Sequence, residues 1–207
     1  MIDVLVLDYG AGNLRSVVRA VQTVGGAPRI SDREQDLREA RVVVMPGVGA
    51  AADTMRNLEA HGLVEPVREY IASGRPFLGV CMGLQALLTL SEEGGRHPCL
   101  DVIPGTVRRL PDGQKVPHMG WNTVRQTAAH PVFEGIPDGS YFYFLHSYHV
   151  QPDDSSCVIA EATYGRTFPA VLARDNIVAT QFHPEKSGDL GLRIYANFLA
   201  AVPVPAR

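Results

Sequence analysis

Short apolar runs alternate with helix-like segments up to residue 90. Residues 4–7 (VLVL) and 42–45 (VVVM) are continuous runs typical of strands buried on both faces of a parallel sheet. Between them, residues 14–24 repeat apolar side chains at helical spacing, and a long amphipathic segment, 53–73, precedes a third apolar run, 76–80. This alternation predicts a doubly wound α/β sheet with helices on both faces, whose sites lie at the carboxyl ends of the strands.

The second half of the chain is predicted to be richer in antiparallel sheet. Short β-like runs separated by turn signals occupy residues 106–110, 122–125, 141–145, 158–164, 170–174 and 178–182. An amphipathic helix is expected over residues 188–201, and neither a linker nor a repeat interrupts the pattern. We therefore expect one domain with a mixed sheet over residues 1–202, followed by a short Pro-rich tail at 203–207.

Charge and composition restrict the possible partners. The 207 residues carry a net charge of −3 without a run of Lys or Arg, which argues against a nucleic acid or an anionic membrane surface. Three cysteines, an odd number without metal-ligand spacing, indicate neither a disulfide framework nor a zinc site and fit a reducing cytoplasm. Gly10-Ala11-Gly12 begins like a dinucleotide fingerprint, but Arg15 stands where its third glycine would be. We expect neither a cofactor nor a metal.

The stretch Gly79-Val80-Cys81-Met82-Gly83 joins the third apolar run to an apolar-periodic segment, residues 82–90. This pattern predicts a strand that breaks sharply into a helix, with the cysteine at the corner and glycines where a Cβ would collide with neighbouring backbone. Free N–H groups at a helix start would favour a reactive thiolate. A lone cysteine is more often a small buried hydrophobe, but the flanking glycines favour a nucleophile.

A base for this nucleophile is predicted in His183-Pro184-Glu185, directly after the last β-like run. Residues two apart in extended backbone point the same way, and the proline keeps His183 extended. Glu185 can then accept the imidazole N–H and orient the ring, as in acyl-transfer catalysis. The alternative is a strand-end turn with a surface glutamate. Together with the cysteine corner, the pattern favours a triad of Cys81, His183 and Glu185.

Acyl transfer also requires donors for a developing oxyanion. The backbone N–H of Met82, next after the cysteine, is the expected first donor. Pro46-Gly47-Val48-Gly49 follows a predicted strand, and its glycines would let the N–H of Val48 approach a ligand. The alternative for this loop is a tight strand-to-helix turn without a catalytic role.

The G-x-C-x-G-x-Q corner with a distant H-P-E resembles the triad-bearing, class I glutamine amidotransferases, which have a flavodoxin-like architecture. Three further stretches look like one branch of them, the glutaminase subunit of imidazole glycerol phosphate synthase: residues 8–17 (DYGAGNLRSV), 116–122 (VPHMGWN) and 182–188 (FHPEKSG). The resemblance implies that Cys81 attacks the side-chain amide of L-glutamine, releases ammonia and leaves a thioester for water to hydrolyse. The implied substrate-binding residues are Gly49, Gln85, His146, Ser147 and Tyr148.

The resemblance also implies a partner in a heterodimer, a (β/α)8-barrel cyclase subunit. That subunit would use the ammonia to make imidazole glycerol phosphate and aminoimidazole carboxamide ribotide in histidine biosynthesis. Asn13, Trp121, Tyr143 and Lys186 lie in family-specific stretches at or beside predicted strand ends, so we expect them near the interface. The alternative for these four residues is ordinary packing or surface.

Two other functions remain open at this point. The chain could serve another ammonia-using synthase, such as that of vitamin B6 synthesis, although residues 118–122 argue against it. It could also be a catalytically silent regulatory subunit, against which the complete triad argues.

Overall fold

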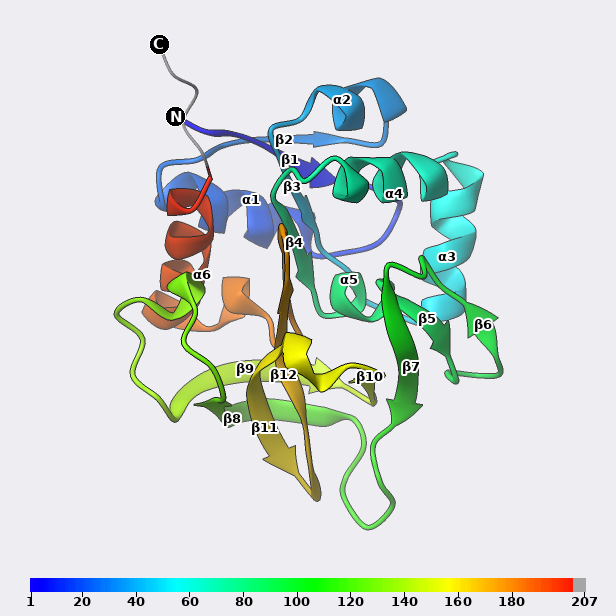
Figure 1. Ribbon diagram of the computed structural model, residues 1–207, viewed down its shortest axis with the longest axis vertical. Coiled ribbons are helices and arrows are strands. Elements are labelled where there is room, and N and C mark those ends of the chain that lie inside the picture. The colour runs from blue at the N-terminus through cyan, green and yellow to red at the C-terminus, as the bar shows by residue number, and fades with distance from the viewer. Residues whose placement is uncertain (203–207) are drawn as a thin grey trace.

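The structure, a computed structural model, describes residues 1–202, so the predicted Pro-rich tail lies outside the described residues (Figure 1). The elements of the first half are β1 (Asp3–Leu7), α1 (Leu14–Thr23), β2 (Ala27–Ser31), α2 (Glu34–Glu39), β3 (Val42–Met45), α3 (Ala51–Ala60), α4 (Val64–Ala72), β4 (Phe77–Val80), α5 (Met82–Gln85), β5 (Leu88–Ser91) and β6 (His97–Pro98). Those of the second half are β7 (Ile103–Arg109), β8 (His118–Gln126), η1 (Pro131–Phe133), β9 (Ser140–His146), β10 (Tyr148–Pro152), η2 (Ser155–Cys157), β11 (Val158–Tyr164), β12 (Arg166–Arg174), β13 (Ile177–Thr180), η3 (Pro184–Lys186) and α6 (Gly188–Ala200).

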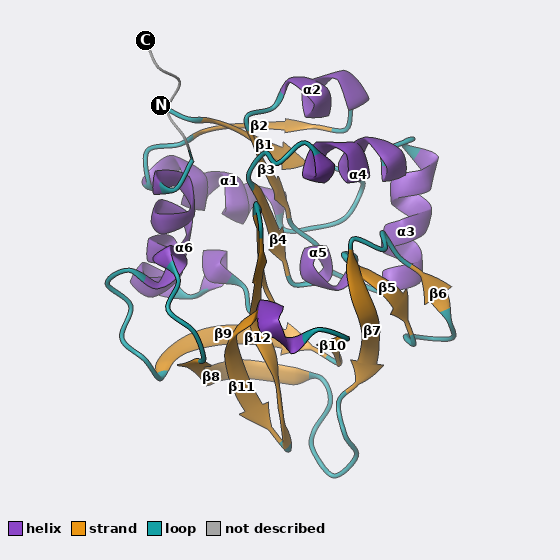
Figure 2. Cartoon of the chain, in the orientation of Figure 1, coloured by secondary structure: helices purple, strands orange, loops and turns teal. Residues whose placement is uncertain are grey.

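Nine strands form the large sheet, in the order β2-β1-β3-β4-β13-β12-β11-β8-β9. The first five are parallel to one another, and the remaining pairings are antiparallel. Helices α1 and α6 cover one face of the parallel part, and α3, α4 and α5 lie on the other (Figure 2). This arrangement confirms the predicted doubly wound mixed sheet.

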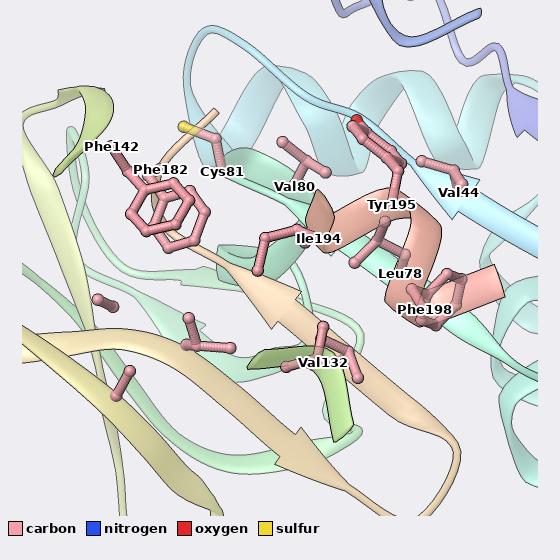
Figure 3. Packing of buried hydrophobic residues seen from close by; sticks show 14 of the residues in the cluster. Val44, Leu78, Val80, Cys81, Val132, Phe142, Phe182, Ile194, Tyr195 and Phe198 are labelled. Carbon is pink, nitrogen blue, oxygen red and sulfur yellow. The ribbon is translucent and has the colours of Figure 1, made fainter. Parts of the chain in front are cut away.

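Alternation along the strands builds a core on each face of the sheet. Val4 and Val6 of β1 pack in the cluster that contains α1 and α6, whereas Leu5 and Leu7 belong to the cluster on the other face. Figure 3 shows side chains of β3 and β4 packed against those of α6 on the first face. Because full burial of one such side chain contributes about 1.5–3 kcal/mol, packing on both sides holds the end of β4 in place.

Two sequence-based expectations are wrong in detail. Residues 53–73 form two helices, because the chain turns at Gly62 with φ of +65°. The helix expected over residues 82–90 ends at Gln85, and residues 88–91 form β5 instead. These residues pair with β7 instead, and Leu88 lies opposite Ile103. Local periodicity does not distinguish these uses of apolar residues.

A second sheet of four strands, in the order β10-β7-β5-β6, lies beside the parallel part. The sequence predicts β7 but not β5, β6 or β10. These three strands are short or come directly after another strand. β10 begins at Tyr148, two residues after the end of β9 in the large sheet, and lies next to α5. Among residues 1–202, no helix combines the length and apolar character that crossing a membrane requires.

Candidate active site

Cys81 lies at a strained corner between β4 and α5. Its φ of +54° and ψ of −101° are unusual for a residue with a side chain, a conformation that costs on the order of 1–3 kcal/mol. Close backbone packing maintains it: a Cβ on Gly79 would lie 2.8 Å from the Gly83 carbonyl oxygen, and one on Gly83 would lie 2.0 Å from that of Met45. The structure thus contains the tight corner that the glycine spacing predicts.

The helix after Cys81 is shorter than expected. With only four residues, α5 has a smaller macrodipole than the helix that the sequence predicts over residues 82–90. Two groups lie near the sulfur instead, at 3.7 Å each: the Leu145 carbonyl oxygen, to which the thiol donates, and the Gln181 Nε2, which donates to the sulfur. Neither residue was indicated by the sequence.

Strand pairing brings His183 to the same edge of the sheet as Cys81. β13 is the parallel neighbour of β4, and the Cys81 N–H donates to the Thr180 carbonyl oxygen over 2.7 Å. His183 follows just beyond β13, and its Nδ1 lies 2.9 Å from Glu185 Oε1. The side chains of His183 and Glu185 are 2% and 1% exposed, so this pair is shielded from water.

The electrostatics of the pair favour a charged imidazolium. Burial by itself would lower the pKa of His183, but the Cys81 thiol and the Glu185 carboxylate act in the opposite sense and raise the pKa above its ordinary value. Nε2 of His183 is buried without a hydrogen-bond partner in residues 1–202. This nitrogen is therefore available for proton exchange with the sulfur or with a bound substrate.

These groups open into a cavity of about 200 Å³. It is lined by Val48, Gly49, Cys81, Met82, Gln85, Glu93, Pro117, Leu145, His146, Ser147, Tyr148 and His183. The structure thus brings together every residue that the sequence placed in the triad, the oxyanion site or the substrate site, with Glu185 alone lying behind His183 and outside the lining. Within residues 1–202, no group of three or more His, Cys, Asp or Glu side chains is arranged to hold a metal.

The loop before α3 packs directly on the corner. A Cβ on Gly47 would lie 2.5 Å from both the Met82 Cβ and the Tyr9 hydroxyl, so only glycine permits this approach. Tyr9 also donates a hydrogen bond of 2.7 Å to the Pro46 carbonyl oxygen, which fixes the loop. Val48 and Met82 both line the cavity together with Cys81.

The class I glutamine amidotransferase family model matches residues 5–202 of this chain. Two similar proteins are both named imidazole glycerol phosphate synthase subunit HisH. That of Chloroflexus aurantiacus is 50% identical over 95% of this chain and 94% of its own length. That of Geobacter sulfurreducens is 49% identical over 96% and 98%. The chain belongs to the HisH family of class I glutamine amidotransferases.

Solved structures of more distant proteins share the fold of this HisH family member. PurLQS from Thermotoga maritima has a TM-score of 0.77 at 15% identity, covering 98% of this chain and 99% of that one. A glutamine amidotransferase from the same organism has a TM-score of 0.64 at 18% identity, covering 93% and 80%. At such low identity these likenesses concern the architecture alone.

Three cavity residues of this HisH chain escaped the sequence reading: Glu93, Pro117 and Leu145. Glu93 follows β5 and accepts a 2.9 Å hydrogen bond from the Ala51 N–H at the start of α3. Burial raises the pKa of Glu93 above its ordinary value. No local signal distinguishes Glu93 from the surface glutamate before it, because only the unexpected strand β5 brings it to the cavity.

Three of the four residues expected at an interface lie together. Trp121 on β8 and Tyr143 on β9 are paired across the strands, and their ring centroids are 6.1 Å apart. The Lys186 ammonium lies 5.8 Å from the centre of the Tyr143 ring. Asn13 lies at the start of α1, beyond the carboxyl end of β1. Trp121 is 56% exposed, which leaves a large aromatic surface uncovered on this HisH chain.

Proposed function

We propose that the chain hydrolyses L-glutamine to glutamate and ammonia through a thioester on Cys81. The observation that supports this most directly is the cavity in which the Cys81 sulfur and the His183 imidazole meet, with Glu185 hydrogen-bonded behind the ring. A thiol, a base and an orienting carboxylate in this order are the components of acyl transfer.

In the first half-reaction, His183 Nε2 takes the thiol proton, and the Cys81 sulfur attacks the side-chain amide carbon of glutamine. The backbone N–H groups of Met82 and Val48 stabilise the negative charge that develops on the amide oxygen, a contribution of about 10²–10³ in rate for one such donor. His183 then gives its proton to the amide nitrogen, and ammonia leaves as the thioester forms.

In the second half-reaction, water attacks the thioester carbon while His183 accepts its proton. The same oxyanion donors act again, and glutamate leaves as the proton returns to the Cys81 sulfur. Glu185 keeps the imidazole in one orientation through both steps and stabilises its charged form. Its burial strengthens that interaction, because water does not compete for the carboxylate.

The rest of the cavity suits the amino-acid end of glutamine. We infer that Gly49, Gln85 and the segment from His146 to Tyr148 bind the substrate, because all of them line the cavity. Glu93 supplies a carboxylate on the same lining, opposite in charge to the α-ammonium group of glutamine.

We further propose that the ammonia passes to a cyclase subunit with a (β/α)8-barrel fold. That subunit makes imidazole glycerol phosphate and aminoimidazole carboxamide ribotide in histidine biosynthesis. The names of the HisH relatives, which are subunits of imidazole glycerol phosphate synthase, support this partner. The exposed Trp121, with Tyr143 and Lys186 beside it, suits a docking surface, and Asn13 lies at a carboxyl strand end as well.

An assay of the two-subunit complex tests the proposal. We expect Cys81→Ala to reduce glutamine-dependent synthesis by at least about 10⁵-fold, while added ammonia still supports the cyclase at the wild-type rate. Loss of the ammonia-dependent reaction in an intact complex would argue against separate glutaminase and cyclase sites. A wild-type complex that makes product from ammonia but never from glutamine would identify a silent subunit.

A further inference from the structure

Buried histidines connect β8 to the wall of the cavity. Nδ1 of His118 lies 3.0 Å from Nε2 of His146, and Nδ1 of His146 lies 2.8 Å from the Tyr148 carbonyl oxygen. At the other end, the Asn122 amide nitrogen lies 3.4 Å from Nε2 of His118. His118 and His146 are 4% and 6% exposed, so these contacts are closed to bulk water.

The partners at the two ends determine where the protons lie. A carbonyl oxygen only accepts, so His146 carries its proton on Nδ1 and, when neutral, accepts through Nε2. His118 must then donate through Nδ1 and accept from Asn122 through Nε2. The Asn122 amide is oriented independently: its nitrogen donates to the Thr163 carbonyl oxygen at 2.9 Å, and its oxygen accepts from the Thr123 N–H at 2.8 Å.

Burial keeps both rings neutral, as this pattern requires. It lowers the pKa of His118 to about 4 and that of His146 to about 3. Aromatic packing holds the His118 ring as well: it stacks on Tyr164 with a centroid distance of 4.1 Å and on Phe144 at 5.0 Å. The donor on His118 Nδ1 therefore has a fixed direction.

The chain of hydrogen bonds continues into the proposed substrate site. The Tyr148 carbonyl oxygen that accepts from His146 also accepts a 2.9 Å hydrogen bond from Gln85 Nε2. The same nitrogen donates to Gln181 Oε1 at 3.1 Å. Gln85 Oε1 is buried and has no protein partner in the described part of the chain, although Gln85 lines the cavity. The amide thus has one orientation, with its acceptor left for a ligand.

We propose that His118 is a positioning residue for glutamine: its Nδ1–H holds His146, and the Tyr148 carbonyl that His146 secures holds the amide of Gln85. This inference rests on the proposed glutaminase function, because it assigns the relay to substrate binding. The relay is connected to the Cys81 sulfur only through Gln181, whose Nε2 lies 3.7 Å from that atom. We therefore expect the relay to act mainly on the bound amino acid.

Two variants separate the hydrogen bond from packing. His118→Phe retains an aromatic ring but removes the donor, and His118→Asn retains an amide N–H close to the position of Nδ1. In the complex with the cyclase, we expect His118→Phe to raise KM for glutamine about tenfold, the effect of one buried hydrogen bond, with kcat nearly unchanged. His118→Asn should stay within about threefold of the wild-type KM. Alkylation of Cys81 by iodoacetamide should proceed at the wild-type rate in both.

An unchanged KM in folded His118→Phe would overturn the proposal, and so would an equal rise in both variants, which would indicate packing alone. Nitrogen-15 NMR of the imidazole rings gives a readout that needs no activity: we expect neutral Nδ1–H tautomers for His118 and His146 at pH 7. An Nε2–H tautomer at His146 would remove the relay. A wild-type complex inactive with glutamine would instead contradict the proposed function, while the tautomers would still test the hydrogen bonds.

Discussion

The two ends of the large sheet are built differently. Around β1, β3 and β4, aliphatic side chains fill both faces, and every residue of β3 and β4 is buried. In the ladder of β8 and β9, one face is packed with aromatic rings and histidines, while Met119 and Trp121 on the other are 63% and 56% exposed. The parallel end is therefore a closed core, whereas the antiparallel end leaves one face of its sheet exposed, the face that we propose as the docking surface.

The proposed active site lies where these two regions meet. Cys81 and His183 follow two neighbouring parallel strands, whereas His146 ends β9 at the antiparallel end, and Tyr148 begins β10 of the second sheet two residues later. Rigid packing suits Cys81, the proposed nucleophile, because loosening of its surroundings would relieve the strain in its backbone. The antiparallel strands supply one wall of the cavity and the exposed face of the sheet. Substitutions in the two regions should therefore have separable effects.

Glu185→Gln should produce the largest of these effects. It tests whether the buried pair of His183 and Glu185, at the end of the parallel strands, determines the rate of glutamine hydrolysis. The amide no longer provides the negative charge that stabilises the imidazolium, so we expect kcat for glutamine hydrolysis to fall on the order of 10²–10⁴-fold. Steady-state kinetics with and without the cyclase should show a similar factor. An undiminished rate would exclude Glu185 from the site.

Gly83→Ala tests how tightly the closed region packs. The added Cβ would lie 2.0 Å from the Met45 carbonyl oxygen, so the backbone must move, and we expect a loss of about 3 kcal/mol or more in the free energy of unfolding. Gly62→Ala is the matched control: nothing lies within 4 Å there, and only the φ of +65° is unfavourable. The control should cost about 1 kcal/mol in urea denaturation. Equal losses would show that the corner is not tightly packed.

Trp121→Ala tests whether the exposed face of β8 and β9 binds the cyclase subunit. A central aromatic residue of an interface contributes about 2 kcal/mol, so Kd for the cyclase subunit should rise about 30-fold in isothermal titration calorimetry. Ile30→Ala serves as the control, since Ile30 is 46% exposed on β2 at the opposite edge of the sheet. The control should leave Kd unchanged, and neither variant should lose much stability. The same Kd shift in both would contradict a docking face at β8 and β9.

Acid should lower the free energy of unfolding, because the buried histidines of the antiparallel end bind protons more weakly in the folded protein. The pKa of His118 is about 4 in the folded protein and near 6.5 when unfolded, so the unfolded chain binds more protons between these values. Stability therefore rises with pH in this window, and the contribution of His118 falls by roughly 2–3 kcal/mol as pH drops from 6.5 to 4. Urea denaturation across this range measures the slope, which should be smaller in His118→Phe. An identical slope in that variant would show that His118 does not contribute.

The sequence predicts the strands of the parallel end of the large sheet far better than the contacts made by the antiparallel end. Strands β1 and β3 are continuous aliphatic runs, and the glycines around Cys81 have few other uses, so local pattern is sufficient there. β5 could not be predicted, because its apolar residues fit a continued helix as well as a strand that pairs with β7. The pairing of β5 brings Glu93 to the cavity, and the pairing of β13 with β4 brings Gln181 to the Cys81 sulfur. Neither residue has a distinctive neighbour in sequence. His118 lay in a recognisable stretch, but its contact with His146 required the paired strands.

The hydrogen bond from the Cys81 N–H to the Thr180 carbonyl means that backbone pairing sets the separation of Cys81 from the end of β13, which His183 follows. Adjacent strands lie about 4.8 Å apart in any sheet, a spacing that no side chain alters. About a hundred residues of chain run between these two strands, including the exposed Gly94 and Gly95 next to β6. Insertions at such turns would lengthen the polypeptide and leave the distance between Cys81 and His183 unchanged. Because the sheet sets this distance, the intervening loops can change in evolution while the two side chains keep their relative positions.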